Sequence, residues 1–176
     1  ATSEPRKFSP SPRPMTSGEK YLNAYSPISM QFSSPIAAFG FYATERVQTS
    51  LEDDHECVGT WMTSNNQIHQ LAVIGGPQGK LHHFAFRLED WNSVGRAADL
   101  MTMDDVPIDI GPTRHGITRG QTVYFFDPSG NRNEVFSGGY LAFPDRPANV
   151  WTVDQLGKGI FYHDRELNER FTTVLT

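Results

Sequence analysis

The sequence predicts a single α+β domain built from a repeated β-α-β-β-β module, and three observations support this prediction. The chain has 176 residues, 38% hydrophobic and 20% charged, which is enough apolar surface for a core that needs no cross-links. Residues 81–136 show a strand pattern, an amphipathic helix pattern and three more strand patterns, in that order. A fainter strand–turn–strand pattern ends at Ile74, which indicates an earlier, incomplete copy of the same module.

The first half of the clearer copy begins with the strand pattern Leu81–Leu88. A helix follows, because Asp90 can cap it and because four apolar residues then recur on one face: Trp91, Val94, Ala98 and Met101. In the strand, alternation places His82, Phe84, Phe86 and Leu88 in one apolar row, which we expect to pack under the helix.

Three strands complete this copy, at Val106–Ile110, Thr122–Phe126 and Asn133–Phe136. The last two are joined by Asp127-Pro128-Ser129-Gly130, in which Pro at the second position and Gly at the fourth favour a type I turn. These two strands should therefore form a hairpin.

The earlier copy is weaker: a mostly apolar stretch at Ile36–Val47, then Trp61–Met62, then a strand at His69–Ile74. We therefore expect residues 35–140 to form one domain of two modules, the first incomplete. Residues 1–34, whose first part is rich in Pro and Ser, are expected to be disordered or non-native. Residues 141–176 are expected to pack back on the core through five apolar anchors: Trp151, Ile160, Phe161, Phe171 and Leu175.

Charge and composition restrict the function. A net charge of −5 and a pI near 5.6 argue against a nucleic-acid partner. Cys57 is the only cysteine, so neither an intrachain disulfide nor a cysteine-only zinc site can form. The longest apolar run, Ile36–Ala43, is too short to span a bilayer, and no signal-peptide pattern follows the first basic residues. These features predict a cytoplasmic protein without a membrane partner.

His83 and Glu134 are the first candidate functional residues. Strand alternation turns His83 away from the apolar row, toward the side of the small Ala85. A lone strand histidine is usually structural, and Glu134 has an equally plain alternative as an exposed carboxylate paired with Arg132. A carboxylate buried among Val135 and Phe136, however, would need a partner or a metal ion.

Two more polar residues belong to the same module. Tyr124 lies on the hairpin strand that pairs with Glu134, and His115 lies in the preceding loop, residues 111–120. Histidines, a glutamate and a tyrosine at the strand ends of one module form a set that can hold a divalent ion.

The sequence also resembles a known family along these residues. The stretches that carry the resemblance are Arg114–Thr118, Thr122–Phe136, Leu81-His82-His83-Phe84, Asp154–Lys158 and Phe161–Arg165. They are similar to the signature of extradiol ring-cleaving dioxygenases, and the similarity runs from about Ala38 to the C-terminus. It is closest to the enzymes that act on catechol, in their C-terminal domain.

The resemblance implies the vicinal oxygen chelate fold, with paired β-α-β-β-β modules, and a non-haem Fe(II) held by two histidines and one glutamate. His83 and Glu134 match two of these ligands. His69 matches a histidine that assists substrate deprotonation and oxygen binding, His115 an acid/base histidine, and Tyr124 a tyrosine that hydrogen-bonds the substrate. Two further residues, Ile117 and Ile160, match apolar residues that line the aromatic-ring pocket.

The implied function is cleavage of catechol by O₂ to a ring-opened muconic semialdehyde, in aromatic hydrocarbon catabolism, by a family that usually forms homotetramers. The sequence departs from the family in two respects. We expect it to lack the family's N-terminal two-module domain. The first ligand histidine should fall near Lys20-Tyr21, but no histidine occurs before His55, which lies in a polar loop.

Two other readings stay open. The departures favour a truncated or degenerate chain that folds as a binding module with little or no catalysis. A third reading is another protein of the same fold, such as a glyoxalase-like isomerase or an antibiotic-sequestering protein. The combination of His69, His115 and Tyr124 argues against this third reading, because those proteins do not need such a set.

Overall fold

A computed structural model describes residues 40–176 of the chain. Its first sheet has the strand order β3-β2-β1-β8. β1 (Tyr42–Gln48), β2 (Cys57–Thr63) and β3 (Leu71–Ile74) are antiparallel neighbours, and β8 (Asn149–Thr152) adds to β1 in parallel. The sheet therefore joins the end of the first module to the C-terminal part of the chain.

The second sheet is the complete module, with the strand order β4-β7-β6-β5. β4 (Phe84–Arg87) is followed by helix α3 (Trp91–Met103) and then by β5 (Ile108–Arg114), β6 (Gly120–Phe126) and β7 (Arg132–Gly138). The β6–β7 hairpin is antiparallel as predicted, with its turn held by Asp127, whose carboxylate accepts hydrogen bonds from the backbone of Ser129 and Asn131. The predicted cap of α3 is also present, because the Asp90 carboxylate accepts from the Ser93 amide at 2.8 Å.

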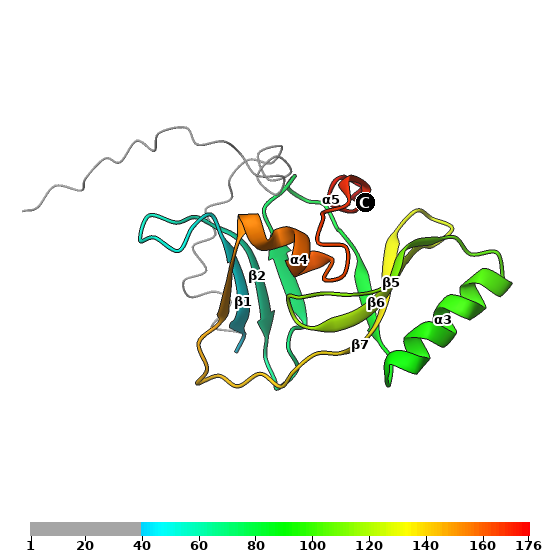
Figure 1. Ribbon diagram of the computed structural model, residues 1–176, viewed down its shortest axis with the longest axis horizontal. Helices are drawn as coiled ribbons and strands as arrows, with labels where there is room; N and C mark the ends of the chain where they lie inside the picture. Colours follow the sequence, from blue (N-terminus) through cyan, green and yellow to red (C-terminus); the bar gives the residue numbers. More distant parts are fainter. Residues whose placement is uncertain (1–39) are drawn as a thin grey trace, which may run out of the picture.

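Helix α3 covers the second sheet over β5, β6 and β7, at the end of the molecule farthest from β1 and β2 (Figure 1). Val94 and Ala98 are buried against Val123, with Met101 and Leu88 packed around them. Trp91 is exposed, so it does not belong to the buried face as predicted. Phe84 and Phe86 are 58% and 56% exposed, which contradicts their placement under the helix. The reason is topological: β4 is one of the two edge strands, and α3 packs over the other three strands.

The strands β4 and β3 both begin later than the sequence indicates. The expected strand at Leu81–Leu88 starts at Phe84, because Leu81 exchanges two backbone hydrogen bonds with Thr176 at the C-terminus instead of joining the sheet. The expected strand at His69–Ile74 starts at Leu71, since Gln70 lies in a turn, where its side chain accepts hydrogen bonds from Ser64. The histidines next to both strands therefore lie in irregular segments.

The C-terminal segment fills the space between the two sheets. After β8 come a 3₁₀ turn, η1 (Val153–Gln155), and two short helices, α4 (Leu156–Ile160) and α5 (Glu169–Thr173), both near the middle of the molecule (Figure 1). Ile117, Val153, Leu156 and Trp61 form one core cluster, and Tyr124, Phe161 and Phe171 form another. Four of the five expected anchors thus pack in these clusters: Trp151, Ile160, Phe161 and Phe171.

Glu45 is buried at the junction of β1, β8 and the loop after His115. Its carboxylate accepts hydrogen bonds from Tyr140 Oη at 2.5 Å, Trp151 Nε1 at 2.7 Å and the Thr118 amide at 3.3 Å. Burial, followed by the contact with Glu45, raises the pKa of Tyr140 well above its ordinary value. Glu45 therefore ties β8 and the His115 loop to the first sheet.

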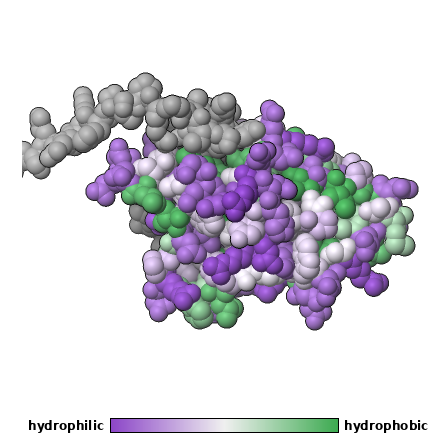
Figure 2. All heavy atoms as spheres, viewed as in Figure 1, coloured by the Kyte–Doolittle hydropathy of each residue, from purple (hydrophilic) through white to green (hydrophobic). Residues whose placement is uncertain are grey.

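The face in Figure 2 is mostly hydrophilic, with hydrophobic side chains gathered in separate patches. Within residues 40–176, no helix is both long and apolar enough to cross a membrane. The predicted ligand position near Lys20-Tyr21 and the expected N-terminal segment, residues 1–34, lie outside the described residues.

Candidate functional site

Glu134 lies at the centre of the candidate site. It stands in β7 directly opposite Tyr124 of β6 and is only 5% exposed. Its Oε2 atom is 3.1 Å from Nε2 of His83, its Oε1 atom is 3.8 Å from Nε2 of His115, and Thr122 Oγ1 donates to Oε1 at 2.5 Å. Strand pairing and the loop before β6 therefore bring two of the residues singled out in the sequence, His83 and His115, to one carboxylate.

The electrostatics keep Glu134 ionised. Burial alone would raise its pKa, but its contacts with the His115 and His83 rings outweigh burial and lower the pKa of Glu134 well below its usual range. The alternative of an exposed carboxylate paired with Arg132 is wrong, because Arg132 pairs with Asp109 instead. A buried, ionised carboxylate that faces imidazole nitrogens is suited to hold a cation.

His115 is fixed by the hydrogen bonds of both ring nitrogens. Its Nδ1 faces the carbonyl oxygen of Ile160, which can only accept, so Nδ1 carries the proton. In the neutral ring Nε2 is then free to accept, and it lies 2.8 Å from the hydroxyl of Tyr124. Burial, followed by the charge of Glu134, raises the pKa of Tyr124 far above its ordinary value, so that hydroxyl stays protonated. His115 therefore presents a basic nitrogen to the site.

The loop that carries His115 is anchored on α4. The amides of Gly116 and Ile117 both donate to the carbonyl of Gly159, at 2.9 and 2.8 Å. A Cβ atom at Gly116 would collide with the carbonyl of Lys158, so only glycine permits this close approach. The C-terminal segment thus determines where the His115 ring lies.

His69 lies beside this group, in the turn before β3. Burial, as the largest cause, lowers its pKa to about 4, and the charges of Glu134, His115 and His83 also act on it. Its Nδ1 atom is buried and has no hydrogen-bond partner within residues 40–176. A neutral histidine with an unused polar atom at the edge of the site is available to interact with a ligand.

The remaining candidate residues are His55, Ile117 and Ile160. His55 is exposed in its loop, where its ring contacts Gln48 and the Glu52 carbonyl, so it does not reach Glu134 as a substitute ligand. Ile117 is 1% exposed within the first core cluster, and Ile160, half-buried, packs against both clusters. These two isoleucines lie beside the His115 loop as part of the core.

Two residues of the site, His83 and Glu134, are placed so that both can bind one divalent ion. Two ligands at right angles and about 2.1 Å from one ion lie about 3 Å apart, close to the 3.1 Å between His83 Nε2 and Glu134 Oε2. Imidazole and carboxylate are also the donors of non-haem iron sites. Within the part of the chain that the structure describes, no group of three or more His, Cys, Asp or Glu residues is arranged to hold a metal ion.

Comparisons with known proteins place this arrangement in a family. Residues 37–135 match the Glyoxalase/Bleomycin resistance protein/Dioxygenase superfamily. The chain belongs to this superfamily. The fold class expected from the sequence, α+β with the vicinal oxygen chelate architecture, is therefore confirmed.

Relatives within this superfamily include extradiol dioxygenases. Metapyrocatechase of Pseudomonas sp. (strain CF600) is 54% identical over 138 residues, which are 78% of this chain and 44% of that protein. The manganese-dependent 2,3-dihydroxybiphenyl 1,2-dioxygenase of Geobacillus genomosp. 3 is 39% identical over 62% of this chain and 36% of its own. The chain thus spans less than half the length of these curated relatives. The resemblance to extradiol dioxygenases is confirmed.

Solved structures of dioxygenases also match this chain. The 2,3-dioxygenase LapB from Pseudomonas sp. KL28 matches with a TM-score of 0.63 and 48% identity over 68% of this chain and 41% of its own. Homoprotocatechuate 2,3-dioxygenase from Brevibacterium fuscum, in complex with 3,4-dihydroxyphenylacetate, matches with a TM-score of 0.72 and 26% identity, over 80% of this chain and 44% of its own.

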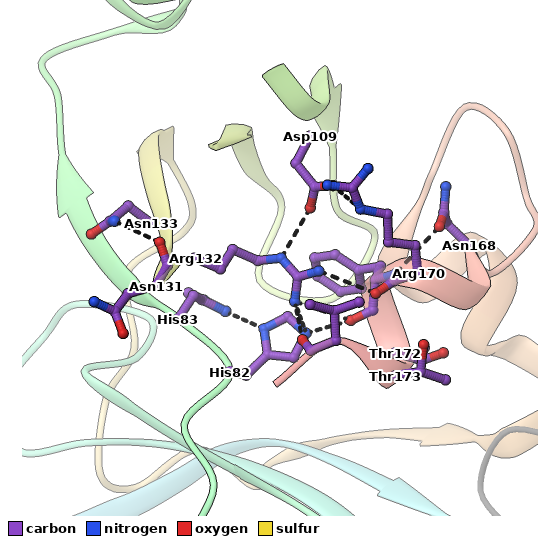
Figure 3. A network of polar contacts seen from close by, with 12 residues as sticks. His82, His83, Asp109, Asn131, Arg132, Asn133, Asn168, Arg170, Thr172 and Thr173 are labelled. Carbon is purple, nitrogen blue, oxygen red and sulfur yellow. Dashed lines mark hydrogen bonds and ion pairs between the residues drawn. The ribbon is translucent and has the colours of Figure 1, made fainter. Parts of the chain in front are cut away.

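The sequence did not indicate a buried polar network that lies next to the candidate site. Arg132, Asp109, His82 and Arg170 form a network that joins the second sheet to the C-terminal segment (Figure 3). Arg132 is fully buried, and its Nε atom lies 3.0 Å from Oδ2 of Asp109, a residue 23 positions earlier in the sequence. No local pattern in the sequence indicates that Arg132 pairs with Asp109. The one available signal is that Arg132 lies in the same strand as the candidate ligand Glu134.

Proposed function

We propose that this chain carries the C-terminal, catalytic part of an extradiol dioxygenase that cleaves catechol to 2-hydroxymuconic semialdehyde. The observation that supports the proposal most strongly is the convergence of His83, His115 and Tyr124 on the buried, ionised Glu134. The identity of 54% to a metapyrocatechase supports the same reaction class.

In the proposed reaction, one O₂ adds to one catechol. The carbon–carbon bond next to a hydroxyl-bearing carbon breaks, both oxygen atoms enter the product, and no external reductant is needed. A bound Fe(II) would supply the one-electron chemistry that O₂ requires. The name of one relative specifies manganese, so the general assignment is a divalent metal ion, and Fe(II) is the proposal for this chain.

The chain's own residues would have separate tasks. His83 Nε2 and the carboxylate of Glu134 would hold the ion. His115 would accept a proton from a substrate hydroxyl at Nε2, because its Nδ1 is committed to the Ile160 carbonyl. The Tyr124 hydroxyl, which stays protonated, would donate to a substrate oxygen, and the neutral His69 would face the substrate and O₂ from the opposite module. Ile117 and Ile160 would support the aromatic ring from the side of the core.

A second candidate is a binding module that holds ligand without turnover. It is favoured by one observation: residues 40–176 bring only His83 and Glu134 together as protein donors for one ion. Two protein donors would leave a metal ion weakly held.

The test is O₂ consumption with catechol after the chain is loaded with Fe(II) under anaerobic conditions, with bound iron measured in the same sample. Consumption that depends on both iron and catechol supports the dioxygenase. Bound iron and bound catechol without O₂ consumption would support the binding module and contradict the dioxygenase. The same preparation, followed by light scattering, tests for a homo-oligomer. We further propose that the protein works in the cytoplasm, where a lone cysteine stays reduced.

A further inference from the structure

His82 occupies a position between the C-terminal segment and the candidate ligand His83 (Figure 3). Its Nε2 atom lies 2.7 Å from the carbonyl oxygen of Phe171 in α5. Its Nδ1 atom lies 2.6 Å from Nδ1 of His83. The proposed function assigns no role to this residue.

These contacts determine the tautomer of His82. A carbonyl oxygen only accepts hydrogen bonds, and Arg132 Nη1 already donates to the carbonyls of Phe171 and Val174, so the shorter contact, from His82 Nε2 to the Phe171 carbonyl, places a hydrogen on His82 Nε2. The guanidinium of Arg132, itself fully buried, lies 3.2 Å from the same nitrogen, and a second positive charge beside it would be costly. The neutral ring then has its lone pair at Nδ1.

The tautomer of His83 follows from that of His82. Because His82 Nδ1 can only accept, the short contact between the two rings requires that His83 Nδ1 donates. This leaves Nε2 of His83 as the nitrogen directed to Glu134, at 3.1 Å, and the one available to a metal ion. The two rings meet edge to face, with centroids 4.8 Å apart, so this bond also fixes the orientation of His83.

The carbonyl at the start of this chain of hydrogen bonds is itself held in place. Arg132 donates to the carbonyls of Arg170 and Val174 at 3.1 and 2.8 Å and contacts that of Phe171 at 3.3 Å. The Nε atoms of Arg132 and Arg170 hold the two carboxylate oxygens of Asp109, at 3.0 and 2.9 Å. The carbonyls near the end of a helix lack intrahelical partners, so these bonds fix the end of α5 against His82.

We infer that His82 is a positioning residue that links the Phe171 carbonyl to His83 and holds the His83 ring with a hydrogen on Nδ1, so that Nε2 is the nitrogen that faces the metal site. This inference rests on the proposed metal site. Partners of metal-ligating histidines typically change metal affinity by about 10- to 100-fold when they are removed. The C-terminal segment thereby acts on the metal site without contributing a ligand.

Three variants test the inference by titration of the 176-residue chain with Mn(II). His82→Asn keeps an acceptor near the position of Nδ1 but loses the bond to Phe171, and it should bind Mn(II) more weakly than the wild type but more tightly than His82→Phe. His82→Gln reaches Phe171 but offers no acceptor to His83, and with His82→Phe it should bind about 10- to 100-fold more weakly. The exposed His163→Phe is the matched control and should change nothing. Wild-type affinity in His82→Phe, or equal weakness in His82→Asn and His82→Phe, would overturn the inference.

A second measurement does not depend on metal binding or on folding of the variants. Two-bond ¹H–¹⁵N spectra of the metal-free wild type report which nitrogen of each histidine is protonated. We expect a hydrogen on Nε2 and none on Nδ1 of His82, together with a hydrogen on Nδ1 of His83. A hydrogen on Nδ1 of His82 would overturn the inference. If the spectra agree but the wild type binds no Mn(II), the proposed metal site fails while the hydrogen-bond chain stands.

Discussion

Glu134 and Tyr124 lie directly opposite each other on the β6–β7 hairpin, and both are buried. His83 joins this pair from the segment before β4 and His115 from the loop before β6. One hairpin therefore aligns the carboxylate of Glu134 with the hydroxyl of Tyr124. Two separate segments then place the His83 imidazole against the carboxylate and the His115 imidazole against the hydroxyl.

Removal of either donor should abolish metal binding. We expect Glu134→Gln and His83→Ala each to lose the Fe(II) that the wild type retains, because neither variant keeps the pair of donors that faces the ion. Metal analysis after gel filtration measures the bound iron. Glu166→Gln, which changes an exposed carboxylate in the C-terminal segment, is the matched control and should retain wild-type iron. Equal iron in the wild type and both site variants would disprove the ligand assignment.

His115→Phe should reduce turnover far more than iron content. The reason is that His115 is proposed to transfer a proton, and loss of a general base typically lowers the rate by about 10²- to 10⁴-fold. Oxygen uptake and metal analysis on the same samples separate the two effects. If iron falls in proportion to activity, His115 is a ligand rather than a base.

The sequence predicts the parts of this site that depend on local patterns. Turn chemistry at Asp127–Gly130 determines the hairpin, and the hairpin determines that Tyr124 lies near Glu134. Strand alternation is a poor guide at His82 and His83, because Leu81 pairs with the C-terminal Thr176 and the strand begins only at Phe84.

Contacts between distant segments are not visible in the sequence. Asp109 and Arg132 look like ordinary surface charges in their strands, yet both are almost completely buried. Glu45 likewise gives no local sign that Trp151, over 100 positions later, will donate to it. Long-range packing, not local propensity, decides these partners.

The Arg132–Asp109 pair should matter strongly for stability. Arg132→Met leaves a buried carboxylate with one partner fewer, and breaking a buried ion pair in this way costs about 3–5 kcal/mol. Urea denaturation of the metal-free chain measures the loss in the free energy of unfolding. Arg96→Met, on the exposed side of α3, is the control and should change that free energy by less than about 0.5 kcal/mol. A similar small change in Arg132→Met would contradict the structural role of the pair.

Burial of His69 predicts that the stability depends on pH. Burial lowers its pKa from 6.5 to about 4 in the folded state, so between these values the unfolded chain binds a proton that the folded chain does not. The free energy of unfolding should therefore decrease as the pH falls from 6.5 to 4, by about 3 kcal/mol for this residue. In urea denaturation of the metal-free chain, His69→Phe should show a shallower pH dependence than the wild type, and the exposed His163→Phe should not. Equal slopes for His69→Phe and the wild type would contradict a buried, neutral His69.

The most direct test of the proposed dioxygenase function is mass spectrometry of the product formed from catechol and ¹⁸O₂ by the Fe(II)-loaded chain. We expect a ring-opened product that carries both ¹⁸O atoms, formed by the wild type and absent from Glu134→Gln. The contradicting result is the absence of this product from a chain that holds its iron, or its formation to the same extent by Glu134→Gln.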